Sequence, residues 1–312
     1  MAAAVAKLKG PFDLIHMDVL QMIRYSEVAL AAAGRKSRVV YNWHNIESEL
    51  MRRYAAAAGS AGRRMYAKQT ESKLARLEKE ILRTAFGHVV CSEREREELL
   101  QAAPKARIVT VENGVDTAYF EGVWDAKGPR RRILFVGKMN YYPNINAARH
   151  LVEKIWPTVR QRMPGMTLTL VGSEPVDAVK ALNDAEGVEV TGTVPDLRPY
   201  YREAVASIVP LRMGGGTRLK ILEAMAARVP VISTKLGAEG LDVEEGRELL
   251  FADADRPEEW ASKLERLACA PEEYSAMTGR ARDLVRGRYD WSIVDGIVRR
   301  TYEEWLGSVA MV

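Results

Sequence analysis

The sequence has little cysteine, no long apolar segment and no strong charge of either sign, and each shortage excludes a class of protein. Its 312 residues contain only two cysteines, Cys91 and Cys269, which lie far apart and form no metal-ligand spacing. Such isolated cysteines favour free thiols in a reducing compartment, so we expect a cytoplasmic protein without disulfides. Cys91 ends an apolar run and is expected to be a small buried residue.

The sequence has no long apolar run and little net charge, which limits the kinds of partner that we expect. No window reaches the ~18 consecutive apolar residues of a membrane span, and the alanine-rich start lacks the apolar core of a secretory signal. The net charge of +4 is too small for a dedicated nucleic-acid binder. We expect no nucleic-acid partner. Peripheral contact with the inner membrane face stays open, through basic stretches such as 63–83, although a solvated helix face explains that pattern equally.

Short apolar runs alternate with amphipathic helical patterns along the whole chain. Uniformly apolar runs, each followed by a helix, are typical of parallel strands that are covered on both faces. The expected helices include 146–162 and 218–227. The pattern predicts an α/β architecture. The expected strands are 12–17, 38–43, 88–91, 107–111, 132–136, 167–171, 188–191, 206–210, 229–233 and 248–251.

A polar segment at 125–129 indicates a boundary between two α/β units. We expect an N-terminal domain over 1–125, a C-terminal domain over 129–290, and a closing helix within 291–312 that packs back towards the N-terminal domain. The first domain has four expected strands and the second has six. Because the first strands of a doubly wound sheet are central, the N-terminal domain is predicted to be incomplete. Its open sheet edge suits a homodimer.

The most informative segment is 210–232, where a strand leads into Gly214, Gly215 and Gly216 and then into a helix. Consecutive glycines let the backbone approach a ligand, and a helix N-terminus offers unpaired N–H groups. Arg218 and Lys220 add cations in the first turn. This arrangement suits a diphosphate; the alternative is a flexible turn before a core helix with basic surface residues.

Three further side chains are candidates for ligand contacts. Glu223 sits among apolar residues, where a carboxylate needs a partner such as a ribose diol or an internal ion pair. Lys138, after Gly137, follows the first strand of its unit, so its side chain either points at the same phosphate or is solvated. His44 follows strand 38–43, which suits either a structural hydrogen bond or a role in catalysis.

The order of several short motifs resembles the GT4 family of retaining GT-B glycosyltransferases over nearly the whole chain. In the first half these motifs are Trp-His-Asn-Ile-Glu (43–47), Cys-Ser-Glu (91–93) and Val-Glu-Asn-Gly-Val-Asp (111–116). In the second half they are Phe-Val-Gly followed by Tyr-Tyr-Pro-Asn (141–144), Leu-Val-Gly (170–172), Val-Thr-Gly-Thr-Val-Pro-Asp (190–196) and Lys-Ile-Leu-Glu-Ala-Met-Ala (220–226).

The resemblance implies two Rossmann-like parallel-sheet domains, with a nucleotide-sugar donor on the C-terminal one and the acceptor received by the N-terminal one. It implies that Glu223 holds the donor ribose as the second acid of an E-x7-E motif, and that Lys138 contacts the diphosphate. It places His44 near the transferred sugar. The donor-binding residues that it implies are Gly137, Val194, Asp196, Gly214, Gly215, Gly216, Thr217 and Glu223.

The chain departs from the family pattern at three places. The first acid of E-x7-E falls at Gly215, so backbone N–H groups are expected to replace its contact. The second basic phosphate contact falls near Asn144, so Arg218 and Lys220 are expected to compensate. The opening strands of the family and their glycine-rich turn have no counterpart before Phe12.

These features predict a retaining glycosyltransferase that moves a sugar from a nucleoside-diphosphate sugar to a glycan or lipid-linked acceptor. No cofactor or metal is expected, because the catalytic work is electrostatic and falls to Lys138, Arg218 and Lys220, with His44 beside the sugar. The alternatives are a non-catalytic nucleotide-sugar-binding module and a GT-B-fold epimerase. A nicotinamide or flavin enzyme fits less well, since no Gly-x-Gly-x-x-Gly follows an opening strand.

Overall fold

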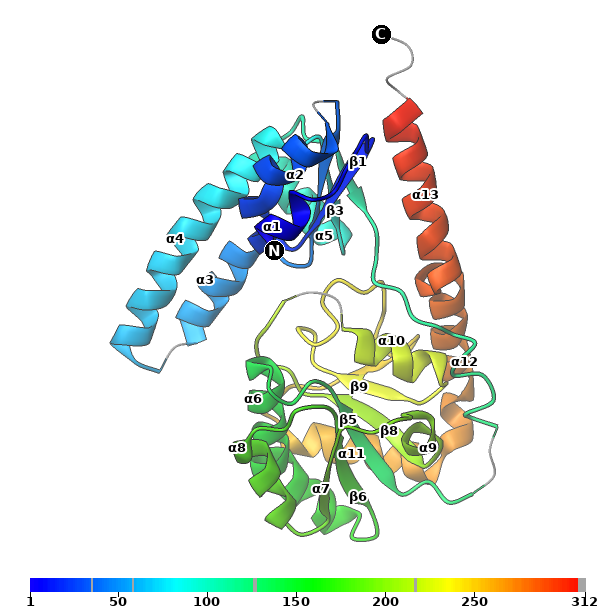
Figure 1. Cartoon of the computed structure of the whole chain (residues 1–312). Helices are drawn as coiled ribbons and strands as arrows, with labels where there is room; N and C mark the ends of the chain where they lie inside the picture. Colours follow the sequence, from blue (N-terminus) through cyan, green and yellow to red (C-terminus); the bar gives the residue numbers. More distant parts are fainter. Residues whose placement is uncertain (35, 58, 126–127, 216–217, 308–312) are drawn as a thin grey trace. The chain divides into compact units, whose positions relative to one another are not determined.

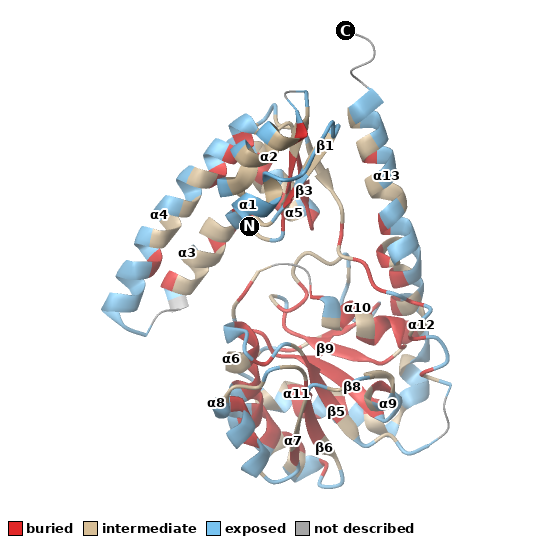
Figure 2. Ribbon diagram, viewed as in Figure 1, coloured by how far each residue is buried: buried red, intermediate tan, exposed pale blue. Residues whose placement is uncertain are grey.

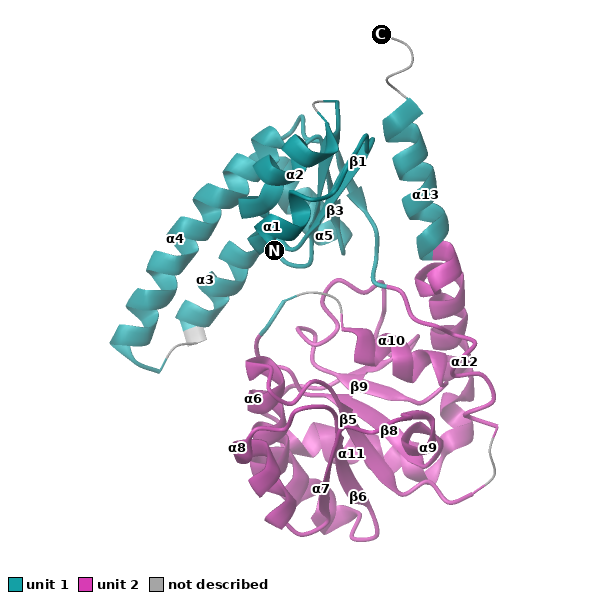
Figure 3. Ribbon diagram, viewed as in Figure 1, with its two compact units in different colours: residues 1–113, 214–217, 294–312 teal, residues 114–213, 218–293 magenta. Residues whose placement is uncertain are grey.

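The computed structural model describes residues 1–312 except 35, 58, 126–127, 216–217 and 308–312 (Figure 1). Internal contacts divide the chain into two compact units, which Figure 3 colours separately. The first unit consists of 1–113, 214–217 and 294–312, and the second of 114–213 and 218–293.

The division falls between Asn113 and Gly114 rather than at the polar segment 125–129. The stretch after Gly114 belongs to the second unit because Phe120 and Val123 are buried in the core of that unit. The hydroxyl of Thr117 also donates a hydrogen bond to Asp290, at 2.6 Å. The second unit therefore begins at Gly114, before the polar segment.

The second unit is built on a six-stranded, fully parallel sheet in the order β10-β9-β8-β5-β6-β7. From the β7 edge, the strands follow the doubly wound order 3-2-1-4-5-6 within this unit. The chain leaves β5 and its neighbour β8 towards opposite ends of the sheet, so the topological switch point lies between them. The strands are β5 (Arg132–Val136), β6 (Thr167–Val171), β7 (Val188–Gly192), β8 (Ala204–Val209), β9 (Val231–Ser233) and β10 (Leu250–Phe251).

The central strands of this sheet are covered on both faces, as their apolar sequences predict. Every residue of β8 is buried, and β5 and β6 are buried except at their first residues (Figure 2). Helix α7 packs against α11, and α10 packs against α12. The helices of the unit are α6 (Tyr142–His150), α7 (Trp156–Arg162), α8 (Asp177–Lys180), α9 (Arg198–Arg202), α10 (Leu219–Ala226), α11 (Pro257–Cys269) and α12 (Ser275–Leu284).

The expected single helix 146–162 is interrupted. Helix α6 begins earlier, at Tyr142, with Pro143 in its first turn, and a π-helical turn, Leu151–Ile155, separates it from α7. Pro157 explains the interruption, because proline has no N–H to donate and its ring crowds the carbonyl four residues earlier.

The first unit contains a smaller parallel sheet whose four strands follow sequence order, β1-β2-β3-β4. All ten strands expected from the sequence are present, each within two residues of its expected ends. Cys91 is buried just after β3. The elements are α1 (Ala2–Val5), β1 (Leu14–Asp18), α2 (Ser26–Ala33), β2 (Arg38–Trp43), α3 (Glu47–Ala57), α4 (Ala61–Thr84), β3 (Gly87–Val90), α5 (Glu93–Ala102) and β4 (Ile108–Thr110).

The last helix, α13 (Trp291–Gly307), groups with the first unit from Val294 onward, and Trp305 near its end contacts β2 and β3. The ring of Trp305 meets Phe86 edge-on, with centroids 6.1 Å apart. A Cβ atom at Gly87 would lie 2.6 Å from the Trp305 ring, so glycine is needed at the start of β3. The C-terminal helix therefore supplies an apolar face that the small first sheet would otherwise lack.

A buried carboxylate links two helices of the first unit. Both oxygens of Glu49, on α3, accept hydrogen bonds from the Arg94 guanidinium of α5, at 3.1 and 3.0 Å. Arg53 Nε donates to the same carboxylate at 3.0 Å. Burial alone would raise the pKa of Glu49, but the hydrogen bonds from Arg94 and Arg53 outweigh it and hold that pKa below its usual value.

We expect Glu49→Gln to lower the free energy of unfolding at pH 7 by about 1–3 kcal/mol, the net worth of hydrogen bonds to a charged group. The lowered pKa of Glu49 means that its contribution is present above the unfolded-state pKa and is lost as pH falls through the lower folded-state value. Urea titrations at pH 7 and pH 3 measure both effects. Glu98→Gln, which removes a more exposed partner of Arg94, is the control; an equal loss in both variants would contradict the prediction.

Candidate active site

The candidate site lies at the carboxyl ends of β5 and β8, on either side of the switch point of the second sheet. Gly137 and Lys138 follow β5 directly, and Arg218 is the residue before α10, the helix that follows β8. Ligands of open α/β sheets bind at this position, because the connections on the two sides of the switch point separate there.

Lys220 is the central cation of this site. Its ammonium donates a hydrogen bond to Asn144 Oδ1 at 2.8 Å and lies 4.3 Å from the centre of the Phe135 ring. The buried Asn144 in turn donates from Nδ2 to the backbone carbonyl of Lys138, at 2.9 Å. One amide therefore ties the loop after β5 to the first turn of α10.

The ammonium of Lys220 is held where its charge is unfavourable. Burial, followed by the positive charge of Arg218, lowers the pKa of Lys220 to about 7, while Glu223 acts in the opposite direction. Arg218 is itself buried. Two cations enclosed this close together repel each other, and an anion between them would remove that cost.

Glu223 lies one helical turn from Lys220 on α10. Burial raises the pKa of the Glu223 carboxyl, against the opposing effects of Lys220 and the Tyr201 hydroxyl. Among the described residues, Glu223 forms no ion pair with an arginine or lysine, so no internal ion pair satisfies this carboxylate. Tyr201 is fully buried beside it, and burial and then the charge of Glu223 raise the pKa of the phenol.

Two glycines permit the close approach of the strands and side chains at this site. A Cβ atom on Gly137 would lie 2.8 Å from both Lys220 Nζ and Asn144 Nδ2. A Cβ atom on Gly172, after β6, would lie 1.6 Å from the carbonyl oxygen of Gly137. Side chains at these positions would fill the space that the ammonium and the loop occupy.

The other predicted donor-site residues are placed less centrally. Lys138 is exposed and pairs with Glu174 at 3.5 Å instead of joining Lys220. The carboxylate of Asp196, after β7, accepts hydrogen bonds from Tyr119 Oη at 2.6 Å and from the backbone N–H of Arg198 at 2.9 Å. These bonds, with the Arg198 guanidinium first, lower the pKa of Asp196 and occupy its carboxylate in holding the loop.

Three of the remaining predicted positions, Val194, Gly214 and Gly215, are loop residues. Val194 is half-buried in the loop after β7, where it packs against the core of the second unit. Gly214 and Gly215 group with the first unit, and Gly214 has a φ of 110°, a conformation that favours glycine. Gly216 and Thr217 lie outside the described residues.

His44 follows β2 in the first unit, as expected, but it is paired with a residue that sequence reasoning missed. Its Nε2 lies 2.6 Å from Oδ1 of Asp18, the last residue of β1. Asn42 Nδ2 donates to the same oxygen at 2.9 Å. The signal that could have found Asp18 is its position, since neighbouring parallel strands place the residues at their carboxyl ends side by side.

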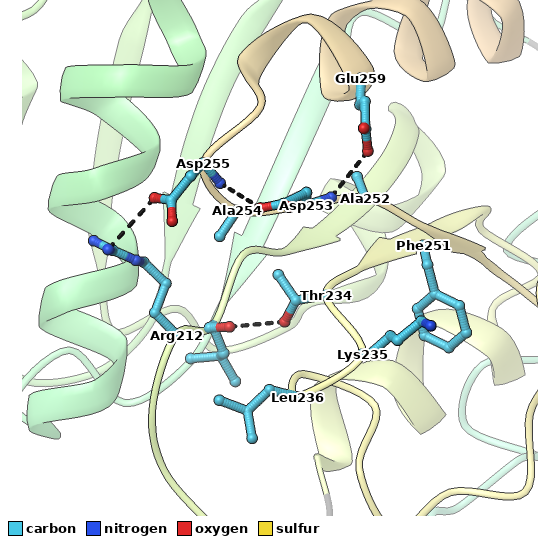
Figure 4. A pocket seen from close by; sticks show the side chains of 11 residues that line it. Arg212, Thr234, Lys235, Leu236, Phe251, Ala252, Asp253, Ala254, Asp255 and Glu259 are labelled. Carbon is cyan, nitrogen blue, oxygen red and sulfur yellow. Dashed lines mark hydrogen bonds and ion pairs between the residues drawn. The ribbon is translucent and has the colours of Figure 1, made fainter. Parts of the chain in front are cut away.

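A hollow of the second unit lies beyond the ends of β8, β9 and β10 and has a volume of about 730 Å³ (Figure 4). Its charged groups are largely engaged with one another: Arg212 pairs with Asp255 at 3.4 Å, and Glu259 accepts a hydrogen bond from the Asp253 N–H at 3.1 Å. Lys220 and Glu223 do not line it. Its walls are Leu211, Arg212, Thr234, Lys235, Leu236, Phe251, Ala252, Asp253, Ala254, Asp255 and Glu259.

The described residues contain no group of three or more His, Cys, Asp or Glu side chains placed to hold a metal ion. They also contain no helix with the length and apolar character needed to span a membrane.

A doubly wound sheet with cations and a carboxylate at its switch point defines a nucleotide-binding type of α/β protein. Two family models identify the family to which the chain belongs. The model described as "Glycosyl transferases group 1" matches residues 130–269, and the "Glycosyl transferase 4-like domain" matches residues 1–114. The chain belongs to the group 1, GT4-type family of glycosyltransferases.

Similar proteins agree with this assignment. The phosphatidyl-myo-inositol mannosyltransferase of Mycobacterium tuberculosis is 28% identical over 214 residues, which cover 65% of this chain and 56% of that protein. The D-inositol 3-phosphate glycosyltransferase of Pseudarthrobacter chlorophenolicus is 27% identical over 215 residues, covering 63% of this chain and 50% of the relative. The chain thus spans about half the length of these curated relatives.

Solved structures show the same GT-B fold. The structure of Anabaena HepE in complex with UDP and glucose has a TM-score of 0.72 at 16% identity and covers 97% of this chain and 79% of that one. Sucrose-phosphate synthase from Thermosynechococcus elongatus has a TM-score of 0.71 at 18% identity, covering 95% of this chain and 74% of that one. The predicted class of two parallel-sheet α/β domains is confirmed.

We expect Gly137→Ala to weaken binding of a nucleoside diphosphate about tenfold or more, because the added methyl displaces Lys220 and Asn144 from their hydrogen bond. Both displaced groups are ends of side chains, so the fold should survive with a loss of about 1–2 kcal/mol. Calorimetric titration and thermal melting measure the two effects. Gly165→Ala is the control, since a Cβ atom there meets open space; unchanged affinity in Gly137→Ala would contradict the prediction.

Proposed function

We propose that this chain is a retaining glycosyltransferase that moves a sugar from a nucleoside-diphosphate sugar to a glycan or lipid-linked acceptor. The observation that carries the proposal is the pair of cations, Arg218 and Lys220, with the largely buried carboxylate of Glu223 one turn away. Cations for a diphosphate and a carboxylate for a ribose diol are the groups that a nucleoside diphosphate requires.

Each group has a role in the proposed transfer. Lys220 and Arg218, with the N–H groups at the start of α10, stabilise the negative charge that grows on the leaving diphosphate. Glu223 accepts hydrogen bonds from the two ribose hydroxyls. Because the Asp196 carboxylate is occupied, we assign contact with the base to the backbone near Val194. These cations supply the electrostatic stabilisation, so the proposal includes no metal and no cofactor.

The relatives support this choice of substrate. Anabaena HepE is solved in complex with UDP and glucose and with UDP-glucose, and the curated relatives are named as mannosyl- and inositol-phosphate glycosyltransferases. Retention of the anomeric configuration is proposed from the resemblance to the GT4 family. Peripheral membrane contact and a homodimer through the first sheet stay predictions of the sequence.

We expect binding of a nucleoside diphosphate to take up a proton at pH 8. Because the pKa of Lys220 lies at about 7, the free lysine is mostly neutral at pH 8, and the bound diphosphate favours its charged form. Affinity should fall as pH rises through 7. Calorimetry with UDP, GDP and ADP, repeated in buffers of different ionisation enthalpy, measures the proton number, first with a chelator present and then with Mg²⁺.

Two variants and one control make this test specific. Lys220→Met should abolish the proton uptake, Glu223→Gln should weaken binding about tenfold or more, and Lys180→Met, on the exposed helix α8, should change neither. If no nucleotide binds, or if Lys220→Met takes up the same number of protons, the assignment of the donor site is wrong.

Product analysis then separates the remaining alternatives. A transferase releases the nucleoside diphosphate and gives a glycosylated acceptor, an epimerase converts the sugar nucleotide without an acceptor, and a binding module leaves the donor intact. Nuclear magnetic resonance of the new glycosidic bond establishes whether the configuration is retained.

A further inference from the structure

The first unit holds a histidine and an aspartate at hydrogen-bond distance where two neighbouring strands end. Asp18 ends β1, and its Oδ1 lies 2.6 Å from Nε2 of His44, which follows β2. The strands are parallel and Asp18 is the register partner of Asn42, so the strand pairing fixes where the Asp18 carboxylate lies. Asn42 donates to the same oxygen and holds it in place.

This contact determines which ring nitrogen of His44 carries the proton. An ionised carboxylate only accepts hydrogen bonds, so the nitrogen facing it must be the N–H. Burial acts to raise the pKa of Asp18, but its hydrogen bonds to His44 and then Asn42 outweigh burial and hold that pKa below its usual value, so the carboxylate is ionised at neutral pH. Neutral His44 is therefore the Nε2–H tautomer, with an accepting lone pair at Nδ1.

The accepting nitrogen is available to a ligand. The structure gives His44 hydrogen bonds through Nε2 only within the described part of the chain, and 45% of its side chain is exposed. A pair as exposed as this contributes little to stability, because water and salt screen it. Its contribution to folding therefore does not explain why the two side chains are held together.

The backbone beside the pair is strained. Val19, directly after Asp18, has a φ of 67°, a conformation that β-branched residues rarely adopt. The Val19 N–H donates to the carbonyl of Asn42 at 3.3 Å, which ties this turn to β2. Strain of this kind persists where the surrounding structure enforces it, and it gathers at functional sites.

We infer that Asp18 is a positioning residue for His44: it accepts the Nε2–H proton and leaves Nδ1 as the atom that accepts a hydrogen bond from a substrate hydroxyl. The inference rests on the proposed glycosyltransferase function, since sugars and acceptors supply such hydroxyls. Other titratable groups near the pair include His16, whose Nδ1 lies 2.5 Å from the Tyr302 hydroxyl, Glu47 and the buried Cys91.

The tautomer can be measured without any substrate. The chain has only four histidines, so ¹H–¹⁵N correlation spectra of the imidazole rings can be assigned with His44→Gln. We expect the Nε2–H pattern for His44 in the wild type and in Asp18→Asn, whose amide oxygen accepts the same proton, and mixed tautomers in Asp18→Ala. Asp13→Asn, an exposed carboxylate just before β1, is the control. An Nδ1–H pattern in the wild type, or an unchanged pattern in Asp18→Ala, overturns the inference.

Measurements of kcat, KM and unfolding then test whether Asp18 affects the reaction. Asp18→Ala should lower kcat roughly tenfold to a hundredfold, with Asp18→Asn retaining more activity and with the KM for the donor and the unfolding midpoint nearly unchanged. An active Asp18→Ala with wild-type kcat overturns the inference while the proposed function stands. If the wild type transfers no sugar while His44 shows the Nε2–H pattern, the proposed function fails and the pairing of Asp18 with His44 stands.

Discussion

The hydrogen bond between Lys220 and Asn144 is the interaction on which the proposed donor site depends. It joins two elements far apart in the sequence, and the second hydrogen bond of Asn144 fixes the loop after β5. Burial and the charge of Arg218 disfavour the charged form of Lys220 and lower its pKa to about 7. A neutral side chain at this position would not carry that electrostatic cost. In the proposed donor site, a bound diphosphate would favour the charged form of this lysine.

The sheets position the functional groups of both units in the same way. In the second unit the loop after β5 and the helix after β8 meet at the switch point, and in the first unit Asp18 and His44 meet where β1 and β2 end. The second sheet has the larger core, with β8 buried throughout. Rigid strand ends suit electrostatic catalysis, because dipoles and charges that are already oriented need no reorganisation during the reaction.

The sequence predicted the fold better than the site. Apolar strands and helix patterns are local signals, so all ten strands could be placed, whereas the π-helical turn before Pro157 depends on one residue within a helical pattern. The glycines, Lys220 and Glu223 could be named because they follow one another along the chain. The partner of Lys220 could not, because Asn144 is 76 residues away and only the packed sheet brings them together. Asp18 was missed for the same reason.

In the proposed donor site, the second cation that contacts the diphosphate comes from a different helix than the family pattern implies. The resemblance to the family implies that cation near position 144, on α6, where this chain has asparagine; in the proposed site Lys220 on α10 takes its place. Lys220 and Glu223 are three residues apart and therefore lie on one face of the same helix. Ile221, Leu222, Ala224 and Met225 of this helix are fully buried, so α10 cannot move independently of the core. In the proposed donor site, one helix therefore sets the contacts to the diphosphate and to the ribose, and a change in the packing of α10 would alter both together.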